Sequence, residues 1–153
     1  MSIPSPEIAA RQRWMSILAR ADAAAMTAHL ADAPALPACT TLRGPETGLV
    51  MLRGRAGGGG GKFNLGEMSV TRCTVRSAGG FIGHAYVQGR DAAQAELAAR
   101  LDAALQDPAR RDALEQLVIT PLAGAQASAR AATASKAAAT RVQFFTMATM
   151  RTS

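Results

Sequence analysis

The chain has 153 residues, of which 48% are hydrophobic and 18% are charged, and its formal net charge is +6. A chain of this length fits one domain that buries roughly 70% of its unfolded surface. It contains no apolar run near the ~20 residues that span a membrane, and residues 1–20 lack the apolar core of a signal peptide. We therefore expect a single domain, 1–153, in the cytoplasm.

The cysteine and arginine contents narrow the class of protein further. The two cysteines, Cys39 and Cys73, do not form a Cys-x-x-Cys motif, which favours free thiols over a disulfide or a zinc site. Of the 17 basic residues, 15 are Arg. Because guanidinium groups suit phosphates and carboxylates, this favours an anionic ligand or an acidic partner surface. The codon bias of a GC-rich genome would produce the same excess.

Residues 5–33 have the pattern of two short helices. Ser5 can cap the first helix, with Pro6 at its first position, and Asp22 can cap the second. Pro34 follows the second helix and stops it.

Residues 40–88 then alternate polar and apolar side chains, as antiparallel strands do. We expect strands at 47–55, 62–76 and 80–88, joined as a meander because no helical crossover separates them. In the third strand the odd-numbered residues should face one side, and the even-numbered residues, His84 and Tyr86 among them, the other.

Residues 91–140 return to a helical pattern. Asp91 can cap a helix with leucines at four-residue spacing, and a second helix should start at Pro108. We expect Pro121 and Gly124 to break that second helix. Ten of the 17 residues from 123 to 139 are Ala, which predicts a helix that either packs very closely on another element or forms a loosely held arm.

The most aromatic stretch of the chain, residues 141–147, suits a terminal strand or an anchor for a partner. Together these elements predict an α+β fold with N-terminal helices, a small antiparallel β-meander, C-terminal helices and a possible final strand.

The sequence shows no active site of its own. Five glycines precede Lys62, but Ala56 and Phe63 stand where a phosphate-binding loop needs Gly and Ser or Thr, so a hairpin loop is the better interpretation. His84 lies in a strand, where a structural histidine is commoner than a functional one. No Ser or Cys is recognisably paired with a base, and no metal-ligand spacing is present. We predict no catalytic residue, metal site or cofactor.

Charged residues gather on the predicted sheet instead. They are Arg43, Arg53, Arg55, Arg72 and Arg76, with Glu46 and Glu67. They form either a solvated outer face or a docking surface for triphosphate, phosphonate or acidic side chains. Stacking on nucleic acid needs exposed aromatic residues, and only 4% of the chain is aromatic. We therefore expect no nucleic-acid partner.

Five stretches, taken in order, resemble the PhnG family of the bacterial carbon–phosphorus lyase system. They are 11–18, 45–50 leading into 53–55, 63–67 with 70–73, 89–91 with Glu96, and 141–147. The resemblance covers nearly the whole chain, and residues 123–139 are its least family-like part.

The resemblance implies an accessory role in organic phosphonate catabolism. PhnG proteins form a multi-subunit core with the sister subunits PhnH, PhnI and PhnJ. This core works with the ATPase-like PhnL. The assembly displaces adenine from ATP with an alkylphosphonate and yields a ribose 1-phosphonate 5-triphosphate. PhnI carries that chemistry and PhnJ the iron–sulfur radical step. The alternatives are a purely structural scaffold of this core and a free-standing basic nucleic-acid-binding domain.

Within this interpretation several residues are candidate contacts. We expect Arg72, with Glu46 and Arg53 as second choices, near the shared active site. Further candidates for contact with substrate or partner are Glu67, His84 and Arg90. Candidates for the partner interface are Trp14, Phe144 and Phe145.

Overall fold

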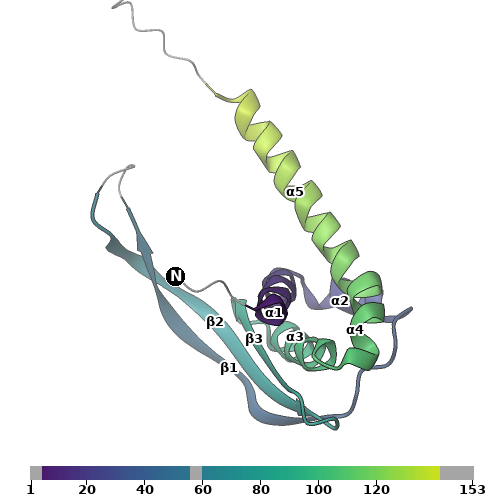
Figure 1. The fold of residues 1–153 in the computed structure, drawn as a ribbon. Helices are drawn as coiled ribbons and strands as arrows, with labels where there is room; N and C mark the ends of the chain where they lie inside the picture. The colour runs from purple at the N-terminus through teal and green to yellow at the C-terminus, as the bar shows by residue number, and fades with distance from the viewer. Residues whose placement is uncertain (1–4, 56–59, 142–153) are drawn as a thin grey trace, which may run out of the picture.

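The computed structural model describes residues 5–55 and 60–141. Its helices and strands follow the predicted α+β order (Figure 1). They are α1 (Pro6–Leu18), α2 (Ala23–Leu30), β1 (Cys39–Gly54), β2 (Phe63–Ser77), β3 (Ile82–Gln88), α3 (Ala92–Leu105), α4 (Pro108–Leu114), the π-helical turn η1 (Glu115–Ile119) and α5 (Thr120–Ala139). The predicted final strand, 141–147, lies outside the described residues from 142 onward.

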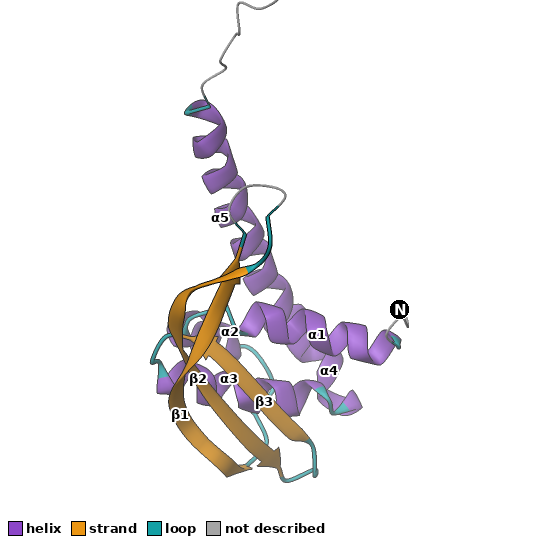
Figure 2. Ribbon diagram, turned by 90° about the vertical axis from the view of Figure 1, so that its left-hand side faces the viewer, coloured by secondary structure: helices purple, strands orange, loops and turns teal. Residues whose placement is uncertain are grey.

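The three strands form an antiparallel sheet in the order β1-β2-β3, which confirms the predicted meander (Figure 2). β3 is much shorter than its neighbours and pairs with 70–76 of β2. Residues 49–54 of β1 and 63–69 of β2 therefore continue as a two-stranded ribbon, which we call the arm. The arm extends away from the helices (Figure 1).

A bulge in β1 sets which residues face each other across the sheet. Arg43 lies opposite Thr74 and Glu46 opposite Arg72, so β1 has one residue more than β2 between these pairs. Pro45 lies in this irregular stretch, where a residue without an N–H group disturbs the strand pairing least. The bulge brings the Glu46 side chain next to Arg72.

One face of the sheet is covered by α3. Odd- and even-numbered residues of β3 face opposite sides, as the alternation predicted, and the structure shows that the odd-numbered ones are buried and the even-numbered ones exposed. Gly83 permits the close approach of α3, because a Cβ atom there would overlap the carbonyl oxygen of Ala99 and the backbone nitrogen of Ala103. Leu101 and Leu105 of α3 are fully buried in the same core.

The predicted break at Pro121 is wrong. The chain stays helical from α4 through η1 into α5, and Pro121 lies in the first turn of α5. A proline inside a helix removes one backbone hydrogen bond and crowds the preceding turn. The wider π-helical turn directly before it accommodates this, and the Thr120 hydroxyl donates to the Glu115 carbonyl (2.8 Å). Gly124 lies within α5.

The second half of α5 projects beyond the other helices (Figure 1). Residues 127–141 are all exposed, so most of the Ala-rich segment is a projecting helix that does not pack on another described element. Within the ranges that the structure describes, no helix is both long and apolar enough to cross a membrane.

Candidate functional site

The outer face of the sheet, opposite α3, carries a cluster of three charged residues. The Glu46 carboxylate accepts a hydrogen bond from the Nε of Arg72 (2.6 Å), and it forms an ion pair with Arg43, whose Nε lies 2.6 Å away. All three side chains are substantially exposed, and such ion pairs contribute only about 0–1 kcal/mol each to stability. The cluster is therefore better suited to binding than to holding the fold together.

A groove of about 230 Å³ lies beside this cluster. It combines the Arg72 guanidinium, the Glu46 carboxylate and the apolar side chains of Val50 and Val70 with the ring of Tyr86, which is 59% exposed. An anionic group entering the groove would meet the guanidinium of Arg72, which Glu46 already orients. It would have to displace that carboxylate to bind the guanidinium fully.

The other predicted contact residues lie elsewhere. Arg53 and Glu67 belong to the arm, and Arg90 precedes the start of α3. Among the described residues no hydrogen bond or ion pair joins any of them to Arg72 or Glu46. The structure thus brings together Arg72 and Glu46 of the predicted set.

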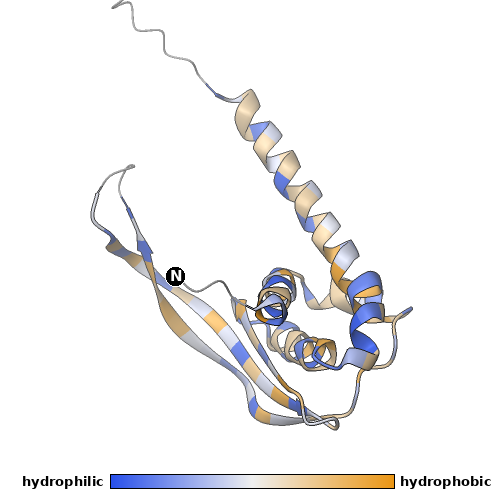
Figure 3. Cartoon of the chain, in the orientation of Figure 1, coloured by the Kyte–Doolittle hydropathy of each residue, from blue (hydrophilic) through white to orange (hydrophobic). Residues whose placement is uncertain are grey.

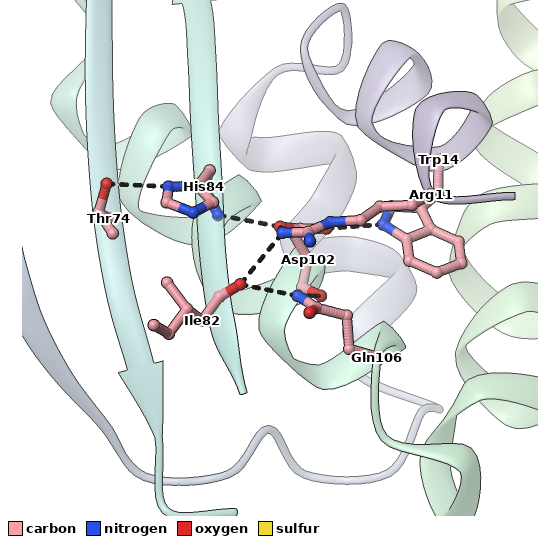
Figure 4. Close-up of polar contacts among 7 residues, drawn as sticks. All are labelled: Arg11, Trp14, Thr74, Ile82, His84, Asp102 and Gln106. Atoms are coloured by element: carbon pink, nitrogen blue, oxygen red, sulfur yellow. Dashed lines mark hydrogen bonds and ion pairs between the residues drawn. The ribbon is translucent and has the colours of Figure 1, made fainter. Parts of the chain in front are cut away.

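A second polar cluster is centred on Asp102 of α3, whose side chain is fully buried. Its carboxylate accepts four hydrogen bonds (Figure 4). The donors are Arg11 Nη2 (2.7 Å) and Nε (3.2 Å), Trp14 Nε1 (2.8 Å) and the backbone N–H of His84 (2.9 Å). Burying a charge is costly unless it is paired and hydrogen-bonded, and here every lone-pair direction has a donor. The cluster ties α1 to α3 and β3.

His84 does not form a catalytic triad with this carboxylate. Its ring Nδ1 lies 3.2 Å from the Thr74 hydroxyl, but Asp102 contacts the backbone N–H of His84 and not the ring (Figure 4). A triad needs the carboxylate on the far ring nitrogen, where it orients the imidazole as a base. Thr74 and His84 therefore form an ordinary hydrogen-bonded pair on the exposed outer face of the sheet.

The family model described as "Phosphonate metabolism protein PhnG" matches residues 9–150. The chain belongs to the PhnG family. The alpha-D-ribose 1-methylphosphonate 5-triphosphate synthase subunit PhnG of Rhizobium meliloti (strain 1021) is 45% identical to it over 140 residues. Those residues are 92% of this chain and 89% of the relative. The region that matches the PhnG model contains both the Glu46 groove and the Asp102 cluster.

The structure places the expected interface residue Trp14 in the core of this PhnG chain. Its side chain is 2% exposed, its indole N–H is bound to Asp102, and Arg111 lies 5.8 Å from its ring centroid. A side chain buried in this way offers no surface to a partner, so Trp14 is not part of a partner interface. Phe144 and Phe145 lie outside the described residues.

Sequence reasoning missed Arg11 and Asp102. A signal was available, because Asp102 sits beside Leu101 in the helix whose leucines form the predicted core stripe. A carboxylate in such a position is almost never buried without a partner, so an Arg from a distant segment could have been expected. The sequence alone does not show which segment supplies this Arg, because that depends on how α1 packs against α3.

Both cysteines are free thiols in the structure. Burial raises the pKa of the Cys73 thiol above its ordinary value, and the negative charge of Glu96 adds to this rise. Cys73 is therefore a core side chain with an unreactive thiol.

Proposed function

We propose that this chain is the PhnG subunit of an alpha-D-ribose 1-methylphosphonate 5-triphosphate synthase, which displaces adenine from ATP with an alkylphosphonate. The observation that carries the proposal is the 45% identity to such a subunit over 92% of this chain. The match also covers 89% of the relative, which supports treating residues 1–153 as one domain with the same role.

In this proposal the chain is an accessory subunit, and its partners are PhnI, PhnH, PhnJ and PhnL. The geometry of the outer face supports this role. It offers oriented guanidinium groups beside an apolar groove, whereas its histidine has no carboxylate on its ring to make it a strong base. Such a face can bind charge without transferring a proton or a group.

The Glu46 groove is the proposed point of contact with the shared active site. Arg72 and Arg43 are held by one carboxylate, and a triphosphate or phosphonate oxygen could replace it on both forks with charge-assisted hydrogen bonds. Arg72 is mounted on the central strand of the sheet, which fixes its position better than a loop would.

Reconstitution from purified subunits tests the accessory role. We expect no release of adenine from ATP by the isolated chain, with or without methylphosphonate, and release by the complex only when the chain is added. Steady release by the chain alone, abolished by one substitution in it, would show that it is the catalyst. Full activity of the other subunits without it would show that it is dispensable.

Residues 141–147 are the proposed anchor for PhnI. Phe144 and Phe145 would contribute about 1.5–3 kcal/mol each if a partner buried them. We expect a chain truncated before Arg141 to lose co-purification with PhnI, and an unchanged yield of the complex would reject the anchor.

A further inference from the structure

The arm exposes more large apolar side chains than any other described part of the chain. Leu49 is 64% exposed, Leu65 63% and Met51 53%. Other exposed apolar side chains of the arm are Val50, Leu52 and Phe63. They come from both strands and from successive positions of β1, so they occupy both faces of the ribbon. Figure 3 shows hydrophobic segments along it.

An arm of this kind is poorly stabilised in the free chain. Two-stranded ribbons are marginally stable in water unless a third strand or a helix covers a face. β3 ends opposite Val70, so within residues 5–55 and 60–141 no third strand pairs with the arm. Contiguous exposed apolar surface on a folded protein commonly marks a site of protein interaction.

The charges around this apolar surface are mostly positive. The arm and its tip carry Arg53, Arg55 and Lys62 against the single acidic residue Glu67. The exposed part of α5 carries Arg130 and Lys136, and Arg141 follows the helix. No acidic residue follows Glu115 in the sequence. The arm and α5 project from the same side of the remaining structure (Figures 1 and 2). The two elements are therefore complementary to a surface that carries negative charge.

We infer that the arm and the exposed segment 127–141, which is the end of α5 and the two residues after it, together bind one partner protein, whose surface is apolar against the arm and acidic around it. The inference rests on the proposed function, since the partner would be another subunit of the synthase. A protein fits this surface better than a nucleic acid, because the exposed side chains are mainly aliphatic. Binding to single-stranded nucleic acid relies on aromatic side chains that stack with the bases.

Substitutions that remove the apolar surface test the first half of the inference. We expect Leu49→Thr with Leu65→Thr to weaken binding to the other subunits at least tenfold in a titration followed by light scattering or calorimetry. Threonine keeps the preference for strand structure, so the ribbon should persist and thermal unfolding should be unchanged. Ile8→Gln, at a similarly exposed site on α1, is the matched control and should bind like the wild type.

A charge reversal tests the second half. Lys62→Glu should weaken the same association and reduce its dependence on salt concentration, because one pairing with an acidic partner group is lost. Arg76→Glu makes the same change in net charge on an exposed residue of the sheet outside the arm. We expect that variant to retain wild-type affinity.

The possible results separate this inference from the proposed function. A wild-type chain that binds the other subunits while the arm variants bind equally well would overturn the inference and leave the function intact. Arm variants that keep their affinity for the subunits but lose salt-sensitive binding to an RNA oligonucleotide would also overturn it. A wild-type chain that binds none of the subunits would contradict the function and the inference together.

Discussion

The two strands β1 and β2 run through two very different environments. Beside β3 they are covered by α3, and alternate residues of β2 such as Cys73 and Val75 are buried. In the arm the same strands are exposed on both faces, and Leu49 and Leu65 are open to solvent. A β-ribbon becomes part of a core only where another element covers it, so the arm depends on a cover from outside the chain.

Polar groups show the same contrast. The buried carboxylate of Asp102 is matched by donors from three other residues, and no buried side-chain polar atom among the described residues lacks a partner. The exposed Glu46 cluster is held by ion pairs that solvent screens. The first arrangement serves stability, and the second remains available for binding.

Removing the buried charge of Asp102 should have the largest effect on the stability of the part of the fold that α3 covers. We expect Asp102→Asn to lower the free energy of unfolding by about 3–5 kcal/mol, because it leaves the Arg11 guanidinium without its counter-charge in a partly buried site. Urea denaturation measures this loss. Asp112→Asn, on the exposed surface of α4, should change the value by less than about 0.5 kcal/mol. Equal effects would show that the Asp102 cluster is not what holds α1 to α3.

The exposed cluster should instead matter for activity. If Arg72 contacts a triphosphate, its charge-assisted hydrogen bonds are worth roughly 1.5–3 kcal/mol. Arg72→Ala should then lower the rate of adenine displacement by the reconstituted complex by about tenfold to a hundredfold. Arg76→Ala, four residues along the same face of β2, is the control and should retain activity.

Assembly must be scored in the same samples. An Arg72→Ala chain that fails to assemble would mean that Arg72 pairs with a carboxylate of a partner subunit. Normal assembly with full turnover would reject both roles and leave the chain as a structural scaffold.

The contact between β3 and α3 should respond to a single methyl group. Gly83→Ala places a Cβ against the backbone of Ala99 and Ala103, and overpacking of this kind typically costs about 1–3 kcal/mol. Gly48→Ala, in the open part of β1 where a Cβ meets nothing within 4 Å, serves as the control in the same thermal unfolding experiment. Similar midpoints for the two variants would show that α3 does not pack this closely.

Features that depend on local periodicity could be predicted from the sequence. The two-residue alternation in 80–88 predicted that β3 has two different faces, and the cap residues Asp22 and Asp91 predicted where helices begin. These signals involve only a few neighbouring residues, so they do not depend on how the elements pack against one another.

Features that depend on register or on distant segments could not be predicted. The pairing of Glu46 with Arg72 follows from two register shifts in β1, each of which adds one residue to that strand, and no local pattern fixes where such a shift falls. The partners of Asp102 on α1 lie about 90 residues away in sequence. The expected break at Pro121 failed because a single π-helical turn relieves the strain that a proline introduces.

Amide hydrogen exchange of the chain, alone and within the assembled synthase, tests most directly whether the arm and α5 require an external cover. We expect fast exchange at 49–54, 63–69 and 127–139 in the free chain and strong slowing there in the complex. Exchange in β3 and α3 should be slow in both samples. Unchanged exchange in the arm on assembly, with slowing confined to β3 or α3, would contradict the account.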